Sequence, residues 1–242
     1  MGRPPAKGGK GAKKRGAGRT TAERVHTARG RKPSSTRWLQ RQLNDPYVQE
    51  AVRQGLRSRA AFKLMELDDR FGFLKPGARV VDLGAAPGGW TEAAVARVKA
   101  DTGQGKVVAL DINEMEPVAG ATVLLCDFLD PAAPDRLKDA MDGTADVVLS
   151  DMAAPATGHA ATDHLRIMAL AEAAHAFAAE ILSEGGVFIA KVLQGGAERD
   201  LLIALKNRFK TVKHAKPAAS RKDSAETYVI AQGFQRTPKG AK

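Results

Sequence analysis

The sequence predicts an α/β fold: a seven-stranded, mostly parallel, doubly wound sheet with helices on both faces. From Gly77 onward, short runs rich in β-branched residues alternate with longer runs of helical periodicity. This alternation is typical of right-handed strand–helix–strand crossovers. The chain has 242 residues, of which 43% are hydrophobic and only 5% aromatic. We therefore expect one large domain whose core is built from Val, Leu, Ile and Ala.

The elements can be placed in order along the chain. Residues 37–56 have a helical pattern that is interrupted at Asp45-Pro46, and Ser58 is the expected N-cap of a helix that ends near Phe71. Strands are expected at 78–83, 106–111, 121–127, 145–151, 186–191, 211–215 and 227–232. Helices are expected at 89–99, 131–141, 162–183 and 197–208. The last two strands leave no room for a helix between them, so we expect one of them to run antiparallel at the edge of the sheet.

The first 36 residues form a separate and strongly basic segment. They contain eleven Lys or Arg and one acidic residue, Glu23, which gives +10 of the chain's formal net charge of +11. The segment is rich in Gly and has no apolar periodicity, so we expect a flexible arm over residues 1–36 and a folded domain over residues 37–242. Such an arm suits a polyanion, because neutralising phosphates releases counterions. A solvated tail is the alternative, and membrane-surface binding is less favoured because the arm has no apolar face.

Several classes of protein are disfavoured by what the sequence lacks. No apolar run approaches the roughly 18 residues that span a bilayer, and the N-terminus has no hydrophobic signal region. Cys126 is the single cysteine and the five histidines are scattered, so neither an intrachain disulfide nor a zinc site is expected. We expect a cytoplasmic, monomeric protein without a metal or a membrane partner.

Charged residues follow four consecutive predicted strands at the point where each strand ends. They are Asp111, Asp127, Asp151 and Lys191. Ligands of open parallel sheets bind outside the carboxyl ends of the strands, where strand order reverses. A single Asp at such a place is more often a turn residue or a helix cap, but four apolar strands that end in the same way are hard to explain as caps. The sequence therefore predicts a ligand site at this edge of the sheet.

The turn after the first predicted strand, residues 84–90 (GAAPGGW), is rich in glycine and allows the backbone to approach a ligand closely. It matches neither the G-x-G-x-x-G of dinucleotide-binding folds nor the phosphate-binding loop with its lysine and hydroxyl. A nucleoside ligand fits better. In this interpretation the Asp111 carboxylate accepts hydrogen bonds from ribose hydroxyls, and Asp127 accepts one from an adenine amino group.

Four motifs in this order carry a resemblance to a known family: residues 57–64 (RSRAAFKL), 83–90 (LGAAPGGW), 150–153 (SDMA) and 190–195 (AKVLQG). Together with Glu226 they resemble the FtsJ/RrmJ family, the bacterial ribosomal RNA large subunit methyltransferase E enzymes, over residues 34–233. The resemblance implies a Rossmann-like class I methyltransferase fold that uses S-adenosyl-L-methionine, with S-adenosyl-L-homocysteine as product. The implied substrate is the 2′-hydroxyl of a uridine ribose in the A-loop of 23S rRNA, within the large (50S) ribosomal subunit.

The resemblance also implies roles for individual residues. The cofactor contacts carried over by position are Gly88, Trp90, Asp111, Asp127 and Asp151. The catalytic set carried over is Lys63, Asp151, Lys191 and Glu226, with Lys191 as the proton acceptor. The chain departs from the family pattern in two substrate-side loops. It has Ala154-Pro155 after the third motif, and Ala225 stands where relatives carry an arginine before Glu226.

Methyl transfer to a ribose hydroxyl needs alignment and a proton acceptor. Orientation can contribute about 7–11 kcal/mol, and a positioned base roughly 10²–10⁴-fold. A lysine accepts a proton only as the neutral amine, which burial and a neighbouring ammonium both favour. We expect Lys63 to supply that ammonium beside Lys191, Asp151 to orient the lysine head, and Glu226 to position Lys63 or the ribose. Helical spacing alone favours another interpretation of Lys63, a packed stem whose head reaches water.

Two other functions remain open from the sequence. One is a ribose methyltransferase that acts on the tRNA anticodon loop, which differs only through the arm and the substrate loops. The other is a non-catalytic RNA-binding factor of ribosome assembly, against which the presence of both lysines, the aspartate and the glutamate argues. Four basic residues are expected to line the RNA path and contact phosphate, with a solvated surface as the alternative: Arg57, Arg59, Arg221 and Lys222.

Overall fold

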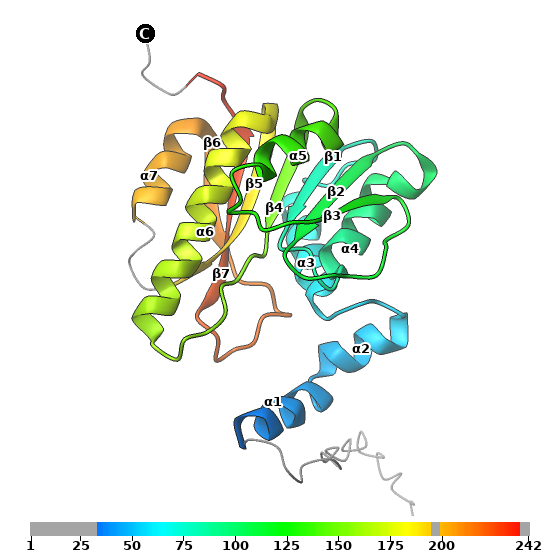
Figure 1. Ribbon diagram of the computed structural model, residues 1–242, viewed down its shortest axis with the longest axis vertical. Coiled ribbons are helices and arrows are strands. Elements are labelled where there is room, and N and C mark those ends of the chain that lie inside the picture. The colour runs from blue at the N-terminus through cyan, green and yellow to red at the C-terminus, as the bar shows by residue number, and fades with distance from the viewer. Residues whose placement is uncertain (1–32, 195–198, 238–242) are drawn as a thin grey trace, which may run out of the picture. The chain divides into compact units, whose positions relative to one another are not determined.

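The computed structural model describes residues 33–194 and 199–237 (Figure 1). Most of the predicted basic arm, residues 1–32, lies outside the described residues. The last four residues of the predicted arm, 33–36, belong to helix α1 (Pro33–Leu43). It begins at a proline, whose fixed φ and missing N–H suit the first turn of a helix. Contacts divide the chain into two units, with the boundary after Asp45.

Two further helices precede the sheet. Helix α2 (Pro46–Gln54) begins at the proline of the predicted interruption, and helix α3 covers Ala60–Phe71. The prediction that Ser58 is the N-cap is wrong, because Arg59 holds that position and makes no side-chain capping bond. The Ser58 hydroxyl still accepts the backbone N–H of Ala60, the first residue of α3, at 3.3 Å. It also packs so closely against Gly89 that a Cβ at Gly89 would clash with it.

The sheet has seven strands in the order β3-β2-β1-β4-β5-β7-β6. Their bounds are β1 Arg79–Leu83, β2 Lys106–Asp111, β3 Ala121–Leu125, β4 Ala145–Ser150, β5 Leu182–Leu193, β6 Phe209–Ala215 and β7 Glu226–Phe234. The first five pair in parallel, and β7 pairs antiparallel with both β5 and β6. The predicted mostly parallel seven-stranded sheet is confirmed. The prediction that the antiparallel strand lies at the edge is wrong, because the crossover from β5 to β6 leaves a gap that β7 fills.

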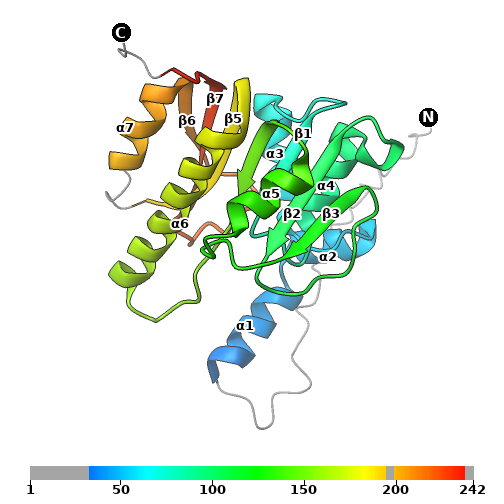
Figure 2. The same ribbon diagram turned by 45° about the horizontal axis from the view of Figure 1, so that its top comes forward.

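Helices cover both faces of the sheet, as predicted (Figures 1 and 2). One face packs against α5 (Ala133–Met141), α6 (Ala160–Ile181) and α7 (Arg199–Arg208). The other packs against α3 and α4 (Gly89–Val98), which is followed by the short 3₁₀ helix η1 (Ala100–Thr102). Successive residues of β1 alternate between the two cores, since Val81 belongs to the first and Val80 to the second. None of the described helices is long and apolar enough to cross a membrane.

The direction of strand succession reverses between β1 and β4. From β1 the chain moves outward to β2 and β3, then returns to β4 on the other side of β1. The crevice outside the carboxyl ends of β1 and β4 is therefore the switch point at which open α/β sheets bind ligands. The fold places residues that follow Leu83 and Ser150 at this crevice.

Candidate active site

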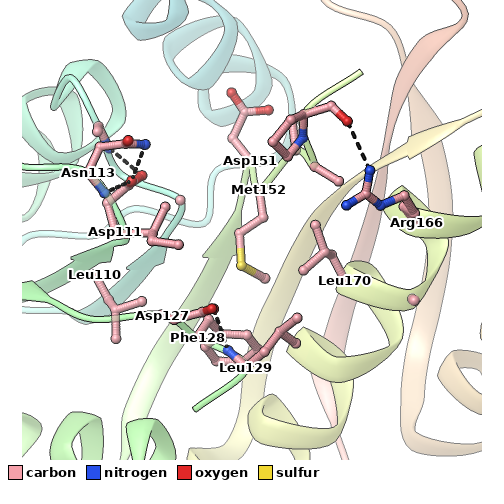
Figure 3. Close-up of a pocket in the computed structure, with 17 residues that line it drawn as sticks. Leu110, Asp111, Asn113, Asp127, Phe128, Leu129, Asp151, Met152, Arg166 and Leu170 are labelled. Atoms are coloured by element: carbon pink, nitrogen blue, oxygen red, sulfur yellow. Dashed lines mark hydrogen bonds between the residues drawn. The ribbon is translucent and has the colours of Figure 1, made fainter. Parts of the chain in front are cut away.

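A cavity of about 570 Å³ opens at the switch point, and three of the predicted residues lie together in its wall (Figure 3). Asp111 ends β2, Asp127 follows β3 by two residues, and Asp151 directly follows β4. The remaining wall is largely apolar and includes Met152 and Leu170. The cavity thus combines apolar surface with a few converging carboxylates, which is typical of small-molecule sites.

The Asp111 carboxylate joins β2 to the glycine-rich turn. Its Oδ2 accepts the backbone N–H of Ala86 at 2.9 Å, and its Oδ1 accepts the backbone N–H and the side-chain amide of Asn113 at 2.8 and 3.0 Å. The turn itself begins at Gly84, which has φ +79° and lies so close to Met152 that a Cβ would stand 2.8 Å from the Met152 backbone. A residue with a side chain at position 84 would therefore separate the ends of β1 and β4.

Asp127 follows β3, the neighbour of β2 in the sheet, and lies beside exposed apolar side chains. Its Oδ1 accepts the backbone N–H of Leu129 at 2.9 Å (Figure 3). Leu129 and Ile112 both line the cavity, and they are 62% and 65% exposed. Large apolar side chains that remain this exposed at a cavity mouth indicate a surface that a ligand can cover.

Two predicted cofactor residues, Gly88 and Trp90, are not among the residues that line this cavity. Gly88 has φ +104° and packs against the side chain of Arg57. Trp90 is 2% exposed, and its Nε1 donates a hydrogen bond to the Ala60 carbonyl at 2.9 Å. The indole therefore fastens α4 to α3, and a contact between these two residues and a cofactor stays a prediction.

A buried polar network adjoins the cavity through Asp151. Lys191 Nζ lies 3.1 Å from Asp151 Oδ1 and donates to the Asp151 backbone carbonyl at 2.5 Å. The same Oδ1 accepts the Tyr228 hydroxyl at 2.9 Å. Lys63 Nζ donates to the Tyr228 hydroxyl oxygen at 3.2 Å and pairs with Glu226 Oε1 at 2.7 Å. The structure thus links all four residues of the predicted catalytic set through one tyrosine.

The two lysines are joined through their partners in this network. Each has its own carboxylate partner, and the Tyr228 hydroxyl bridges the Lys63 ammonium and the Asp151 carboxylate. The Lys63 side chain is only 13% exposed. The interpretation of Lys63 as a stem that carries its head to water is therefore wrong, because its ammonium pairs with the partly buried Glu226 carboxylate.

Tyr228 is the central residue that the sequence interpretation missed. It is fully buried, and burial together with the charges of Asp151 and Glu226 raises its pKa well above the ordinary value. The hydroxyl consequently keeps its proton and can donate to Asp151. A signal for it exists in the sequence, because Tyr228 follows Glu226 by two residues and so faces the same side of β7. It also lies directly opposite Lys191 in the antiparallel pairing of β5 and β7.

Two arginines predicted to line an RNA path hold loops in this structure. The guanidinium of Arg57 donates to the backbone carbonyls of Glu116 and Pro117, at 2.6 and 2.5 Å. The guanidinium of Arg59 donates to the backbone carbonyl of Ala219. A contact between these two arginines and RNA phosphate stays a prediction. It would use guanidinium N–H groups other than those bonded to these carbonyls.

A further carboxyl, Asp82, lies inside β1 behind the cavity. It is fully buried, and Thr91 Oγ1 donates to its Oδ2 at 2.7 Å, whereas Oδ1 has no hydrogen-bond partner among the described residues. Burial raises the pKa of Asp82 from 3.8 to about 7, with smaller contributions from the charges of Asp151 and Asp111. Asp82 therefore gains a proton at a pH at which exposed carboxyls are ionised.

Asp82→Asn is expected to remove a loss of thermal stability that the wild type undergoes as the pH rises from about 4 to about 7. The folded-state pKa of Asp82 is raised, so its contribution to stability is present below about pH 4 and is lost as the pH rises through about 7. Asn cannot ionise and keeps the oxygen that accepts from Thr91. The melting temperature of the variant minus that of the wild type should increase between pH 4 and pH 8 in calorimetric scans. A difference that does not vary with pH would contradict this assignment.

The fold and the site together define a class of protein. A seven-stranded sheet with one inserted antiparallel strand, a glycine-rich turn after β1 and acidic residues at the strand ends are the features of a Rossmann-like class I methyltransferase domain. The chain belongs to the FtsJ-like methyltransferase family, which matches it over residues 56–234.

Individual relatives support this membership. The chain is 61% identical over 241 residues to a ribosomal RNA large subunit methyltransferase E from Parvibaculum lavamentivorans, covering 97% of this chain and 94% of that one. It is 67% identical over 213 residues to the protein of the same name from Rhodospirillum rubrum, covering 88% and 81% of the two chains. Among solved structures, a ribosomal RNA methyltransferase from Plasmodium falciparum superposes with a TM-score of 0.65 at 29% identity, covering 74% of this chain and 98% of that one.

Proposed function

We propose that this protein transfers a methyl group from S-adenosylmethionine to the 2′-hydroxyl of a uridine ribose in the A-loop of 23S rRNA, acting on the large ribosomal subunit in the cytoplasm. One observation carries the proposal. Asp151 lies both in the wall of the switch-point cavity and in the buried network of Lys191, Tyr228, Lys63 and Glu226. A ligand in the cavity and a hydroxyl beside Lys191 would therefore be neighbours.

The residues of the cavity fit S-adenosylmethionine. Its volume of about 570 Å³ is within the usual range for small-molecule sites. The wall carries three carboxylates against one basic side chain, Arg166, which favours a ligand with positive charge. Ile112 and Leu129 offer apolar surface to a planar base, and Asp111 and Asp127 offer acceptors to ribose hydroxyls and an amino group.

The protein's own residues would supply positioning and the proton acceptor. S-adenosylmethionine, when bound, supplies a methyl group that its sulfonium already activates. Lys191, as the neutral amine, would accept the proton of the ribose hydroxyl, whose oxygen would bond to the methyl carbon as the bond from that carbon to the sulfonium sulfur breaks. Asp151 holds Lys191 Nζ from two sides, through its carboxylate and its backbone carbonyl, so that the amine keeps one position. Glu226 and Tyr228 hold Lys63 in the same network.

The choice of RNA rests on the names of the relatives and on the basic composition. Relatives at 61% and 67% identity are named ribosomal RNA large subunit methyltransferase E. The test is incubation with S-adenosylmethionine labelled in its methyl group, together with either large ribosomal subunits or bulk tRNA. Label at one uridine ribose of 23S rRNA is the expected result. Label in tRNA alone would assign the anticodon-loop reaction, and cofactor binding without transfer to either RNA would favour a non-catalytic assembly factor.

Deletion of residues 1–32 is expected to weaken RNA binding without changing cofactor binding. The deleted segment carries nearly all of the chain's net positive charge. Each phosphate contact that is lost should reduce the salt dependence of RNA affinity, by roughly 0.7 in slope for single strands. The measurement is a salt titration of RNA binding by both proteins. Equal affinities and equal slopes would show that the arm does not contact RNA.

A further inference from the structure

The loop between β6 and β7 places a buried hydroxyl against the catalytic network. Ser220 is 4% exposed, and its Oγ donates a hydrogen bond to Glu226 Oε1 at 2.9 Å. That same oxygen pairs with Lys63 Nζ at 2.7 Å. One carboxylate oxygen therefore has two donors, one from helix α3 and one from the loop.

The loop is fastened to the helix that carries Lys63. The backbone N–H of Ala219 donates to Glu66 Oε2 at 3.1 Å, and the Arg59 guanidinium donates to the Ala219 carbonyl. Glu66 lies on α3 and Arg59 is its N-cap residue. Both backbone groups of Ala219, the residue before Ser220, are thus bonded to α3 or to its N-cap residue. The distance between the Ser220 hydroxyl and Lys63 is consequently fixed by the fold.

The loop is also closed on itself. The backbone N–H of Ser220 donates to the Pro217 carbonyl at 2.9 Å, which forms a turn. Lys216 Nζ donates to the Ser224 carbonyl at 2.5 Å and so joins the two ends of the loop. A segment that is bonded at its ends and along its length can hold a side chain in one rotamer, which a positioning residue requires.

We propose that Ser220 is a positioning residue for methyl transfer, which holds the Glu226 carboxylate in the orientation that fixes Lys63. This inference rests on the function proposed above. A carboxylate with one partner can rotate about its last bond, whereas a second donor on the same oxygen removes that freedom. Because Lys63 reaches Asp151 through Tyr228, the orientation of Glu226 is transmitted to the group that holds Lys191.

Ser220→Ala is expected to lower kcat about fivefold to tenfold, as for the loss of one hydrogen bond to a charged group, while KM for S-adenosylmethionine changes less than twofold. Ser183→Ala is the matched control. Ser183 Oγ also donates to a carboxylate, Asp146 Oδ1 at 3.0 Å, but at the opposite ends of β4 and β5. The control should keep the wild-type kcat. A kcat for Ser220→Ala equal to that of the control would overturn the proposal.

A second pair of variants separates the hydroxyl from the shape of the side chain. Ser220→Thr and Ser220→Val have nearly the same shape, but only threonine keeps the donor. The Ser220→Thr variant should have a kcat at least fivefold higher than that of Ser220→Val, even if both substitutions perturb the loop. Equal kcat values would refute a role for the hydroxyl. When Glu226 is already replaced by Gln, adding Ser220→Ala should lower kcat less than twofold, because Ser220 affects the reaction only by orienting Glu226. A full additive loss there would instead indicate a merely structural role.

The outcome for the wild type separates this inference from the proposed function. If the wild type methylates 23S rRNA and the Ser220 variants behave like their controls, only the positioning role fails. If the wild type transfers no methyl group to RNA, the proposed function fails and the positioning role fails with it.

Discussion

Lys191→Ala is expected to reduce methyl transfer at least a hundredfold while leaving the affinity for S-adenosylmethionine nearly unchanged. The expected loss is the contribution of a positioned base, roughly 10²–10⁴-fold. Lys191 is 8% exposed and contacts Asp151, but it does not line the cavity in which the cofactor would bind. The substitution should therefore remove the proton acceptor without removing a cofactor contact. Single-turnover rates with large ribosomal subunits and calorimetric titration with the cofactor measure the two effects separately.

The control for Lys191→Ala is another lysine that pairs with a carboxylate. Lys138 lies on α5, and its Nζ contacts Glu180 Oε2 at 2.6 Å on the surface. Lys138→Ala should keep the wild-type rate. Tyr228 still donates to Asp151 in the Lys191 variant, so that carboxylate is not left without a partner and the fold should persist. A Lys191→Ala protein with more than a tenth of the wild-type rate would disprove the assignment of Lys191 as proton acceptor.

The cavity could be predicted from sequence because a parallel sheet aligns its strand ends. Once β2 and β4 are identified, Asp111 and Asp151 must lie at the same edge, whatever else the chain does. The strands themselves are apolar runs that are buried on both faces, so their pattern is strong. The position of the antiparallel strand was predicted less well. Strand β7 lies between β5 and β6 because the chain that leaves β5 through helix α7 forms β6 one strand position further out. No local sequence pattern indicates how far this crossover extends.

The polar network could be predicted only in part, because it joins segments that are far apart in sequence. Lys63 and Tyr228 are 165 residues apart, and their contact requires α3 to pack on the face of the sheet to which the Tyr228 side chain points. The family resemblance supplied the four ionisable residues. It did not supply the tyrosine between them, for which the only signal in the sequence is its place two residues after Glu226 on the same face of a strand.

One local rule failed: Ser58 has the side chain of an N-cap, yet α3 begins after Arg59. The Ser58 hydroxyl lies against Gly89 at the beginning of α4. Trp90, at the end of the glycine-rich motif, also joins α3 to α4, because its indole donates to the Ala60 carbonyl. The sequence carried the residue types needed for this junction but no signal of which partner each would choose.

Gly84→Ala is expected to cost about 2–5 kcal/mol of folding stability and most of the cofactor affinity. Alanine at φ +79° costs about 1–2 kcal/mol in backbone strain. Its Cβ would also stand 2.8 Å from the Cα and N of Met152. Moving such overpacked groups apart costs about 1–3 kcal/mol more. The melting temperature should fall by roughly 5–15 °C for a domain of this size.

Gly185→Ala separates the two costs of Gly84→Ala, because Gly185 has nearly the same backbone and open space around it. Its φ is +83°, and a Cβ there would meet nothing within 4 Å. Gly185→Ala should therefore show the backbone cost alone and bind S-adenosylmethionine normally. Cofactor affinity is measured by calorimetric titration at a temperature at which both variants are folded. The additional loss of affinity in Gly84→Ala then reports the contact between the ends of β1 and β4. Because Gly84 and Met152 both line the cavity, separating these ends must reshape the site itself, and equal cofactor affinities of the two variants would show that the cavity is not the cofactor site.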